Sequence, residues 1–178
     1  MRRRKILCLA LMFPLLACSD DLPRNVASIY KDRDELLRIF ENVTVGGIRT
    51  SHSTSFIHDG LVNSYFFSME KGKIKMKNAH IQFDIKEFGN PCLETEDGII
   101  EFVEMCVEKM KRHNVSYVTS QFKPQGIDLS FRTRKGDLYY VSDVNNITIP
   151  NWIDAIQSAK KLDDNWYWCP FPRQFKLR

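Results

Sequence analysis

Two histidines and an aspartate lie close together in a polar stretch and could do acid–base or metal chemistry. His52 and His58 supply imidazoles, and Asp59 supplies a carboxylate beside the second of them. Zinc binds such groups, but its sites combine three or four ligands at recognisable spacings, and this spacing matches none. Serines flank His52, yet a nucleophile and its base are usually brought together by the fold rather than by adjacency in sequence. We therefore expect a polar loop here that binds neither a metal nor another cofactor.

Three carboxylates lie close together in the sequence and could supply a paired-carboxylate acid–base site: Glu94, Glu96 and Asp97. They also stand where a helix is expected to begin, and negative charge there is stabilised by the helix dipole. The chain has no GxSxG turn, no HExxH helix, no glycine-rich phosphate loop and no calcium-binding loop. The sequence leaves an enzyme open but favours a protein without catalytic activity.

Aromatic residues gather near the carboxyl terminus. Trp166, Tyr167 and Trp168 are the candidate binding surface, because Trp and Tyr supply large contact areas and are enriched at binding hot spots. The favoured alternative is that they close the hydrophobic core, since aromatic side chains are usually buried. The segment Tyr65-Phe66-Phe67 falls inside a strand-like pattern and is expected in the core.

Residues 1–17 have the layout of a secretory signal peptide. Basic residues from Arg2 to Lys5 precede an apolar stretch that is shorter than the about 20 residues a membrane-spanning helix needs. The stretch ends in Leu15-Leu16-Ala17-Cys18, which resembles the lipobox of bacterial lipoproteins. This resemblance covers the signal segment and none of the folded domain.

The lipobox resemblance implies cleavage before Cys18 and a lipid anchor on that cysteine. Several buried acyl chains, at about 0.8 kcal/mol per methylene, make a firm anchor, whereas one chain is marginal. Ser19 follows, and by resemblance to enterobacterial lipoproteins it implies transport to the outer membrane, with the domain facing the periplasm. Asp20-Asp21 could instead act as a surface-export signal, as in some other bacterial groups. The alternative is an ordinary signal peptide cut nearby, which would leave a soluble secreted protein.

The net charge of the chain comes from the signal peptide. Four of the 26 basic residues lie there, so the rest of the chain has 22 basic and 22 acidic residues. Nucleic-acid binding calls for a clustered basic face, so no nucleic-acid partner is expected. We expect residues 18–25 to be the lipidated cysteine with a short tether and residues 26–178 to be one domain, large enough to fold without disulfide support.

Three cysteines follow the lipobox: Cys92, Cys106 and Cys169. In an oxidising compartment an odd number indicates one disulfide and one free thiol. Cys106 falls on an apolar helical stripe, where a free cysteine behaves as a small hydrophobic residue. We therefore expect a Cys92–Cys169 disulfide that fixes the carboxyl-terminal tail.

Hydrophobic periodicity predicts three helices. Apolar residues recur at helical spacing over residues 26–41, over residues 96–112, and from residue 150 or 151 to residue 161. The middle helix is the clearest, because acidic residues occupy its first turn and basic residues its last, as the helix dipole favours.

Between these helices the hydrophobic period changes to two, which is typical of strands with one buried face. Residues 81–85 and 127–132 both show this alternation. The order of the elements predicts an α+β fold, a mostly antiparallel sheet with about three helices. Two hairpins with a Lys-Gly turn are predicted: residues 61–70 with 73–77, and residues 127–134 with 137–142.

Together these features favour a membrane-anchored extracytoplasmic lipoprotein that acts as a non-catalytic protein-binding module. An inhibitor or a toxin-immunity factor fits the size, the anchor and the neutral charge, by analogy to a class of proteins. A structural or assembly lipoprotein of an envelope complex is the second hypothesis, and a small envelope enzyme whose site forms only in the fold is the third. The expected partners are the membrane, through lipid on Cys18, and one protein.

Overall fold

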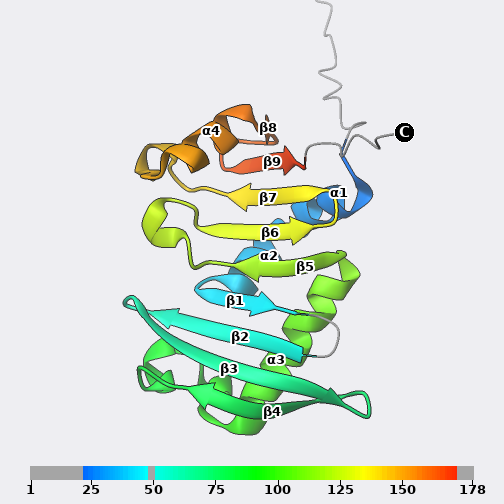
Figure 1. Ribbon diagram of the computed structural model, residues 1–178, viewed down its shortest axis with the longest axis vertical. Coiled ribbons are helices and arrows are strands. Elements are labelled where there is room, and N and C mark those ends of the chain that lie inside the picture. The colour runs from blue at the N-terminus through cyan, green and yellow to red at the C-terminus, as the bar shows by residue number, and fades with distance from the viewer. Residues whose placement is uncertain (1–21, 48–50, 172–178) are drawn as a thin grey trace, which may run out of the picture.

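The fold is built on one large antiparallel sheet. The computed structural model describes residues 22–47 and 51–171, so the predicted signal peptide, the predicted lipobox and Cys18 lie outside the described residues. Within these ranges nine strands form one sheet in the order β4-β3-β2-β1-β5-β6-β7-β9-β8, and every neighbouring pair is antiparallel. The α+β fold with its antiparallel sheet is confirmed (Figure 1). The strands are β1 (Val43–Gly46), β2 (Ser51–His58), β3 (Leu61–Glu70), β4 (Lys73–His80), β5 (Val115–Thr119), β6 (Leu129–Thr133), β7 (Gly136–Tyr140), β8 (Lys160–Lys161) and β9 (Trp166–Pro170).

The described part of the chain contains four α-helices, one more than the periodicity predicts. The segment expected as the first helix is divided at Asp32, whose backbone angles (φ −98°, ψ 17°) depart from helical geometry. The last helix ends sooner than expected, because residues 160–161 pair with β9 as strand β8. The helices are α1 (Arg24–Lys31), α2 (Arg33–Phe40), α3 (Glu96–Arg112) and α4 (Pro150–Ser158).

Helix α3 forms as its sequence predicts. The Thr95 hydroxyl caps it by accepting a hydrogen bond from the backbone N–H of Gly98 at 3.1 Å. Acidic residues occupy the first turn and basic residues the last, so both ends complement the helix dipole. Its buried side is the predicted apolar stripe, made up of Ile99, Val103, Cys106, Val107 and Met110.

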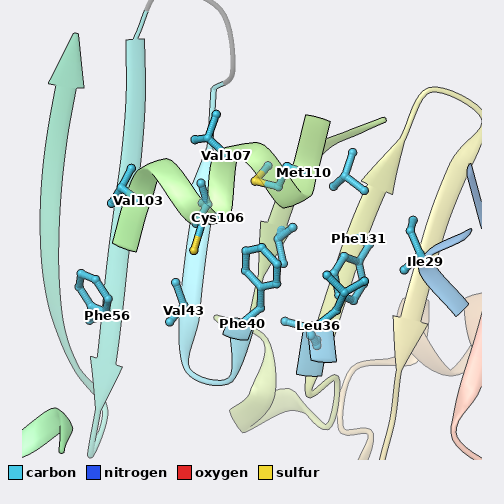
Figure 2. Close-up of a cluster of buried hydrophobic side chains, with 14 of the residues drawn as sticks. Ile29, Leu36, Phe40, Val43, Phe56, Val103, Cys106, Val107, Met110 and Phe131 are labelled. Atoms are coloured by element: carbon cyan, nitrogen blue, oxygen red, sulfur yellow. The ribbon is translucent and has the colours of Figure 1, made fainter. Parts of the chain in front are cut away.

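The main hydrophobic core lies between the sheet and helices α1, α2 and α3, which cover the same face (Figure 1). Figure 2 shows side chains of α2 and α3 pointing toward those of the strands beneath them. Phe40 of α2 meets Phe131 of β6 edge to face, with ring centroids 6.0 Å apart. Phe131 also stacks on Trp166 of β9 at 6.0 Å, so this core continues to the carboxyl-terminal strand.

A second, smaller hydrophobic cluster lies on the opposite face, where α4 packs on the β7–β9 end of the sheet. Ile156 of α4 is buried there with Tyr139 of β7 and Tyr167 of β9. Trp152, one turn earlier in α4, contacts Tyr139 at a centroid distance of 5.5 Å. Among the described residues, α4 is the α-helix on this face and covers only this end, so no α-helix of that part of the chain lies over the remainder (Figure 1).

Both predicted hairpins are confirmed, as β3 with β4 and β6 with β7. The strand predicted at residues 81–85 is wrong: it gives way to an irregular segment and the 3₁₀ turn η1 (Ile85–Phe88). Ile81 is exposed and Phe83 is buried, while the Asp84 carboxylate accepts the backbone N–H of Lys86 and begins the turn. Local capping therefore prevails over a short alternating pattern.

Lysines occupy both edges of the sheet. Edge strand β4 contains Lys73, Lys75 and Lys77, all exposed. The opposite edge strand, β8, consists of only Lys160 and Lys161. An edge strand presents unpaired backbone N–H and C=O groups, and lysines along it oppose pairing with another chain.

Candidate functional site on the open face

The predicted polar loop at His52 is instead strand β2, whose side chains alternate between exposed and buried over residues 51–54. His52 is buried, and its Nδ1 bonds to the backbone carbonyl of Gly47. Its Nε2 has no hydrogen-bond partner among the described residues. The imidazole therefore joins β2 to Gly47 and lies on the core side of the sheet.

His58 lies at the other end of β2, separated from His52 by the length of the strand. Its Nε2 is 3.6 Å from a carboxylate oxygen of Asp59 and 3.9 Å from one of Glu87. Across the part of the chain that the structure describes, no group of three or more His, Cys, Asp or Glu side chains is placed to hold a metal. His58 and Asp59 are thus neighbours, but His52 is not brought together with them.

The carboxylates Glu96 and Asp97 occupy the first turn of α3, where the dipole accounts for them. Glu94 ends the preceding 3₁₀ turn, η2 (Pro91–Glu94), and is exposed. These positions agree with the interpretation that the carboxylates stabilise the start of a helix and are not an acid–base site.

The aromatic tail is not a surface. Trp166, Tyr167 and Trp168 form strand β9 and are all buried, the two tryptophans in the main core and Tyr167 under α4. The candidate binding surface at residues 166–168 is therefore wrong, and the core alternative is correct. The pairing of β9 with β7 places alternate aromatic side chains on opposite faces, each of which is covered at this end.

The three cysteines in the described residues are free thiols. Cys92 is exposed in η2, which packs against α3 at the β4 end of the sheet, whereas Cys169 lies in β9 near the other edge. Strands are spaced about 4.8 Å apart, and several separate the two positions, whereas a disulfide needs Cα atoms within about 7 Å. The expected Cys92–Cys169 disulfide is not formed. Cys106 is buried as expected, and burial raises the pKa of its thiol.

A serine, a histidine and an aspartate meet where α1 crosses the end of α3. The Ser28 hydroxyl lies 2.8 Å from Nδ1 of His113, and Nε2 of His113 lies 3.6 Å from an Asp32 carboxylate oxygen. These are the residue types of a hydrolase triad, but the imidazole is only 1% exposed, and substrate has no access to it. The contact is better explained as a polar tie between the two helices.

The buried histidines predict a loss of stability in mild acid. Burial lowers the pKa of His52 and of His113 below 6.5; Lys111 adds to the effect at His52, and Asp32 opposes it at His113. Below about pH 6.5 the unfolded chain takes up protons while the folded chain keeps neutral imidazoles, so the free energy of unfolding falls as pH falls. The slope is at most about 1.4 kcal/mol per pH unit for each histidine.

Urea unfolding at about pH 7.5 and about pH 5.5 measures this effect. We expect His113→Gln to flatten the pH dependence, whereas the exposed His80→Gln leaves it unchanged. Equal stability of the wild-type protein at both pH values would contradict the prediction.

The surface best suited to binding is the sheet face that α1–α3 leave uncovered. We call it the open face and define it by one row of residues that point away from those helices. The row crosses six strands through cross-strand pairing: Asn78, Phe66, Ser53, Gly46, Tyr117 and Arg132.

Two aromatic side chains on the open face stand on either side of small residues. Phe66 is 45% exposed, although Tyr65 and Phe67 on either side of it are buried. The Tyr117 ring packs closely against Gly46, since a Cβ on that glycine would lie 3.0 Å from two atoms of the ring. Ser53 is exposed and small, so it keeps the surface low between the rings, whereas Gly46 is buried against Tyr117. The prediction that Phe66 lies in the core is wrong, and the period-two alternation of β3 explains why.

Beside this row a cavity of about 300 Å³ lies between the sheet and α4. Its walls are aromatic: Trp152 of α4 contacts Phe122 at a centroid distance of 4.9 Å and Tyr139 at 5.5 Å. Arg132 and Asp137 line it as an ion pair with two parallel hydrogen bonds of 3.0 Å. A mostly apolar cavity with a few fixed polar groups is the usual form of a binding site.

Comparison of the chain with protein-family models, with curated proteins and with solved structures found no match. In the residues that the structure describes, no helix is long and apolar enough to cross a membrane. The case for function therefore depends on the surface itself and on the sequence of the amino-terminal segment.

Proposed function

We propose that the protein is a lipid-anchored extracytoplasmic lipoprotein without catalytic activity that binds a protein partner on its open face. The open face is the observation that carries this proposal. One exposed phenylalanine would be unremarkable, but here Phe66, Tyr117 and Arg132 share a single row. Aromatic residues and arginine are the types that contribute most to protein–protein interfaces.

The rigidity of the surface supports tight binding. The row is carried by strands in one continuous sheet, whose other face packs against three helices. A surface that is already ordered loses little conformational freedom when a partner docks. Partner side chains can approach the sheet closely at Ser53, whose short side chain is exposed.

Within this proposal the protein acts as an inhibitor or a toxin-immunity factor at the outer membrane, facing the periplasm. Its anchor is lipid on Cys18, supported by the lipobox resemblance at residues 15–18. The near-balance of charge in the rest of the chain favours one specific partner over nonspecific attachment to a polyanion.

The test is affinity capture from envelope and secreted fractions with the full-length lipidated chain in detergent as bait. We expect one stoichiometric partner whose capture falls at least about tenfold with Phe66→Ser, a hot-spot effect. Ser53→Arg should have the same effect by placing bulk on an exposed position without removing any core contact.

Met105→Ser is the matched control, since Met105 is an exposed apolar residue on α3, on the other side of the sheet. A partner that binds all three variants equally well would show that the open face is not the docking surface. The absence of any specific partner would refute the proposal as a whole.

A further inference from the structure

Arg132 is held in a fixed direction at the edge of the cavity beside the open face. Its Nε and Nη2 donate hydrogen bonds to the two carboxylate oxygens of Asp137, both at 3.0 Å. The Asp137 side chain is only 7% exposed and accepts a further hydrogen bond from the Tyr139 hydroxyl at 3.2 Å. Both carboxylate oxygens therefore accept hydrogen bonds, and the guanidinium that they hold has lost most of its freedom before any ligand arrives.

The other side of the guanidinium is available. A guanidinium has five N–H donors in a planar fork, and Asp137 uses two of them. The Arg132 side chain remains 57% exposed, and hydrogen bonds from its Nη1 to other described residues are not observed. The Nη1–Nη2 side can therefore bind a second planar anion, such as a carboxylate, by donating two parallel hydrogen bonds to it.

The cavity next to this fork suits an apolar group of aromatic size. Its volume is about 300 Å³, and Phe122, Trp152 and Tyr139 form its walls. Ser130 and Thr119, both buried hydroxyl residues, also line it. A ring in this space would pack against aromatic faces while an attached carboxylate reached Arg132.

We infer that Arg132 and this cavity form a subsite for a carboxylate attached to an aromatic group. This inference rests on the proposed function: the protein partner supplies the group, as an acidic residue next to an aromatic one. Arg132 lies in the same row as Phe66 and Tyr117, so a partner on the open face would reach it. The alternative is that the ion pair only joins β6 to β7 and that the remaining N–H donors of Arg132 face water.

The probe is the dipeptide acetyl-Glu-Phe-amide, titrated into the full-length protein in detergent while NMR follows the Trp152 indole N–H. We expect saturable binding with a dissociation constant near or below about 1 mM. The neutral isostere acetyl-Gln-Phe-amide should bind with an affinity lower by about tenfold or more, because it lacks the charge-assisted hydrogen bonds to Arg132.

Arg132→Lys keeps the positive charge but loses the fork, and it should weaken acetyl-Glu-Phe-amide binding about tenfold. The control is Arg134→Lys, at an exposed position in the turn between β6 and β7, and this variant should bind the peptide like the wild type. Unchanged indole signals of the buried Trp166 and Trp168 show that the core of each variant is intact. Equal affinity for the two peptides, or equal behaviour of the two lysine variants, would overturn the subsite.

Two further comparisons test whether the partner supplies the carboxylate and distinguish failure of the subsite from failure of the proposed function. If 3-phenylpropionate binds as tightly as the dipeptide and partner capture is insensitive to Arg132→Lys, the assignment to the partner is overturned. Capture lost with Phe66→Ser but retained with Arg132→Lys, together with equal affinity for acetyl-Glu-Phe-amide and acetyl-Gln-Phe-amide, overturns the subsite and leaves the proposed function. Dipeptide binding without any captured partner supports the subsite and removes the proposed function.

Discussion

Replacement of Cys18 by serine is expected to move the protein from the membrane to the soluble fraction. The lipobox resemblance places a thioether-linked diacylglyceryl group on this cysteine, and serine offers no thiol to form it. Several acyl chains at about 0.8 kcal/mol per methylene hold a protein firmly, so their loss leaves no comparable attachment. Fractionation and palmitate labelling of cells measure the result.

Cys8→Ser is the control for this change, because Cys8 lies inside the apolar stretch and ahead of the cleavage position. The control variant should be labelled and membrane-bound like the wild type. Palmitate labelling that survived in Cys18→Ser would show that the lipid is attached elsewhere or that the lipobox interpretation is mistaken.

Replacement of Gly98 by alanine is expected to lower the free energy of unfolding by about 2 kcal/mol or more, despite the helix propensity of alanine. Propensity alone would favour alanine over glycine by about 1 kcal/mol in a helix interior. Here a Cβ would lie 1.6 Å from the backbone carbonyl oxygen of Cys92, so the junction between η2 and α3 has to move. Backbone atoms cannot rotate away as a flexible side chain can, and the turn that caps α3 is disturbed.

Urea unfolding at neutral pH measures the Gly98→Ala effect as a lower midpoint with a similar slope. Gly60→Ala is a useful comparison, because nothing lies within 4 Å of a Cβ there and only the strain of its positive φ (+80°) remains. A Gly98→Ala protein as stable as the wild type would contradict the close approach seen at this junction.

Sequence patterns predict the parts of this fold whose signals are local. The ends and the buried stripe of α3 follow from residues within one helix, and the β3–β4 hairpin follows from two alternating runs around Gly72. The central strands β1 and β5 are short, and the chain gives little local sign of them. Their stability comes from pairing with each other and with β2 and β6, which are contacts between distant residues.

The candidate site was less accessible from the sequence. Phe66 could have been found, because strand alternation requires it to point away from Tyr65 and Phe67. Its alignment with Tyr117 and Arg132 depends on the strand order, which the sequence does not determine. The burial of the aromatic tail depends equally on β9 pairing with β7.

The lysines at the two edges of the sheet have a consequence for how copies of this protein behave when crowded. A nine-stranded sheet with a bare, neutral edge could lengthen indefinitely by adding one molecule to the next. Here β4 would bring three ammonium groups, and β8 two, against the corresponding groups of another copy. Lateral growth into a fibre is thereby opposed at both ends, so high local concentration is tolerated while the broad face between the edges stays available.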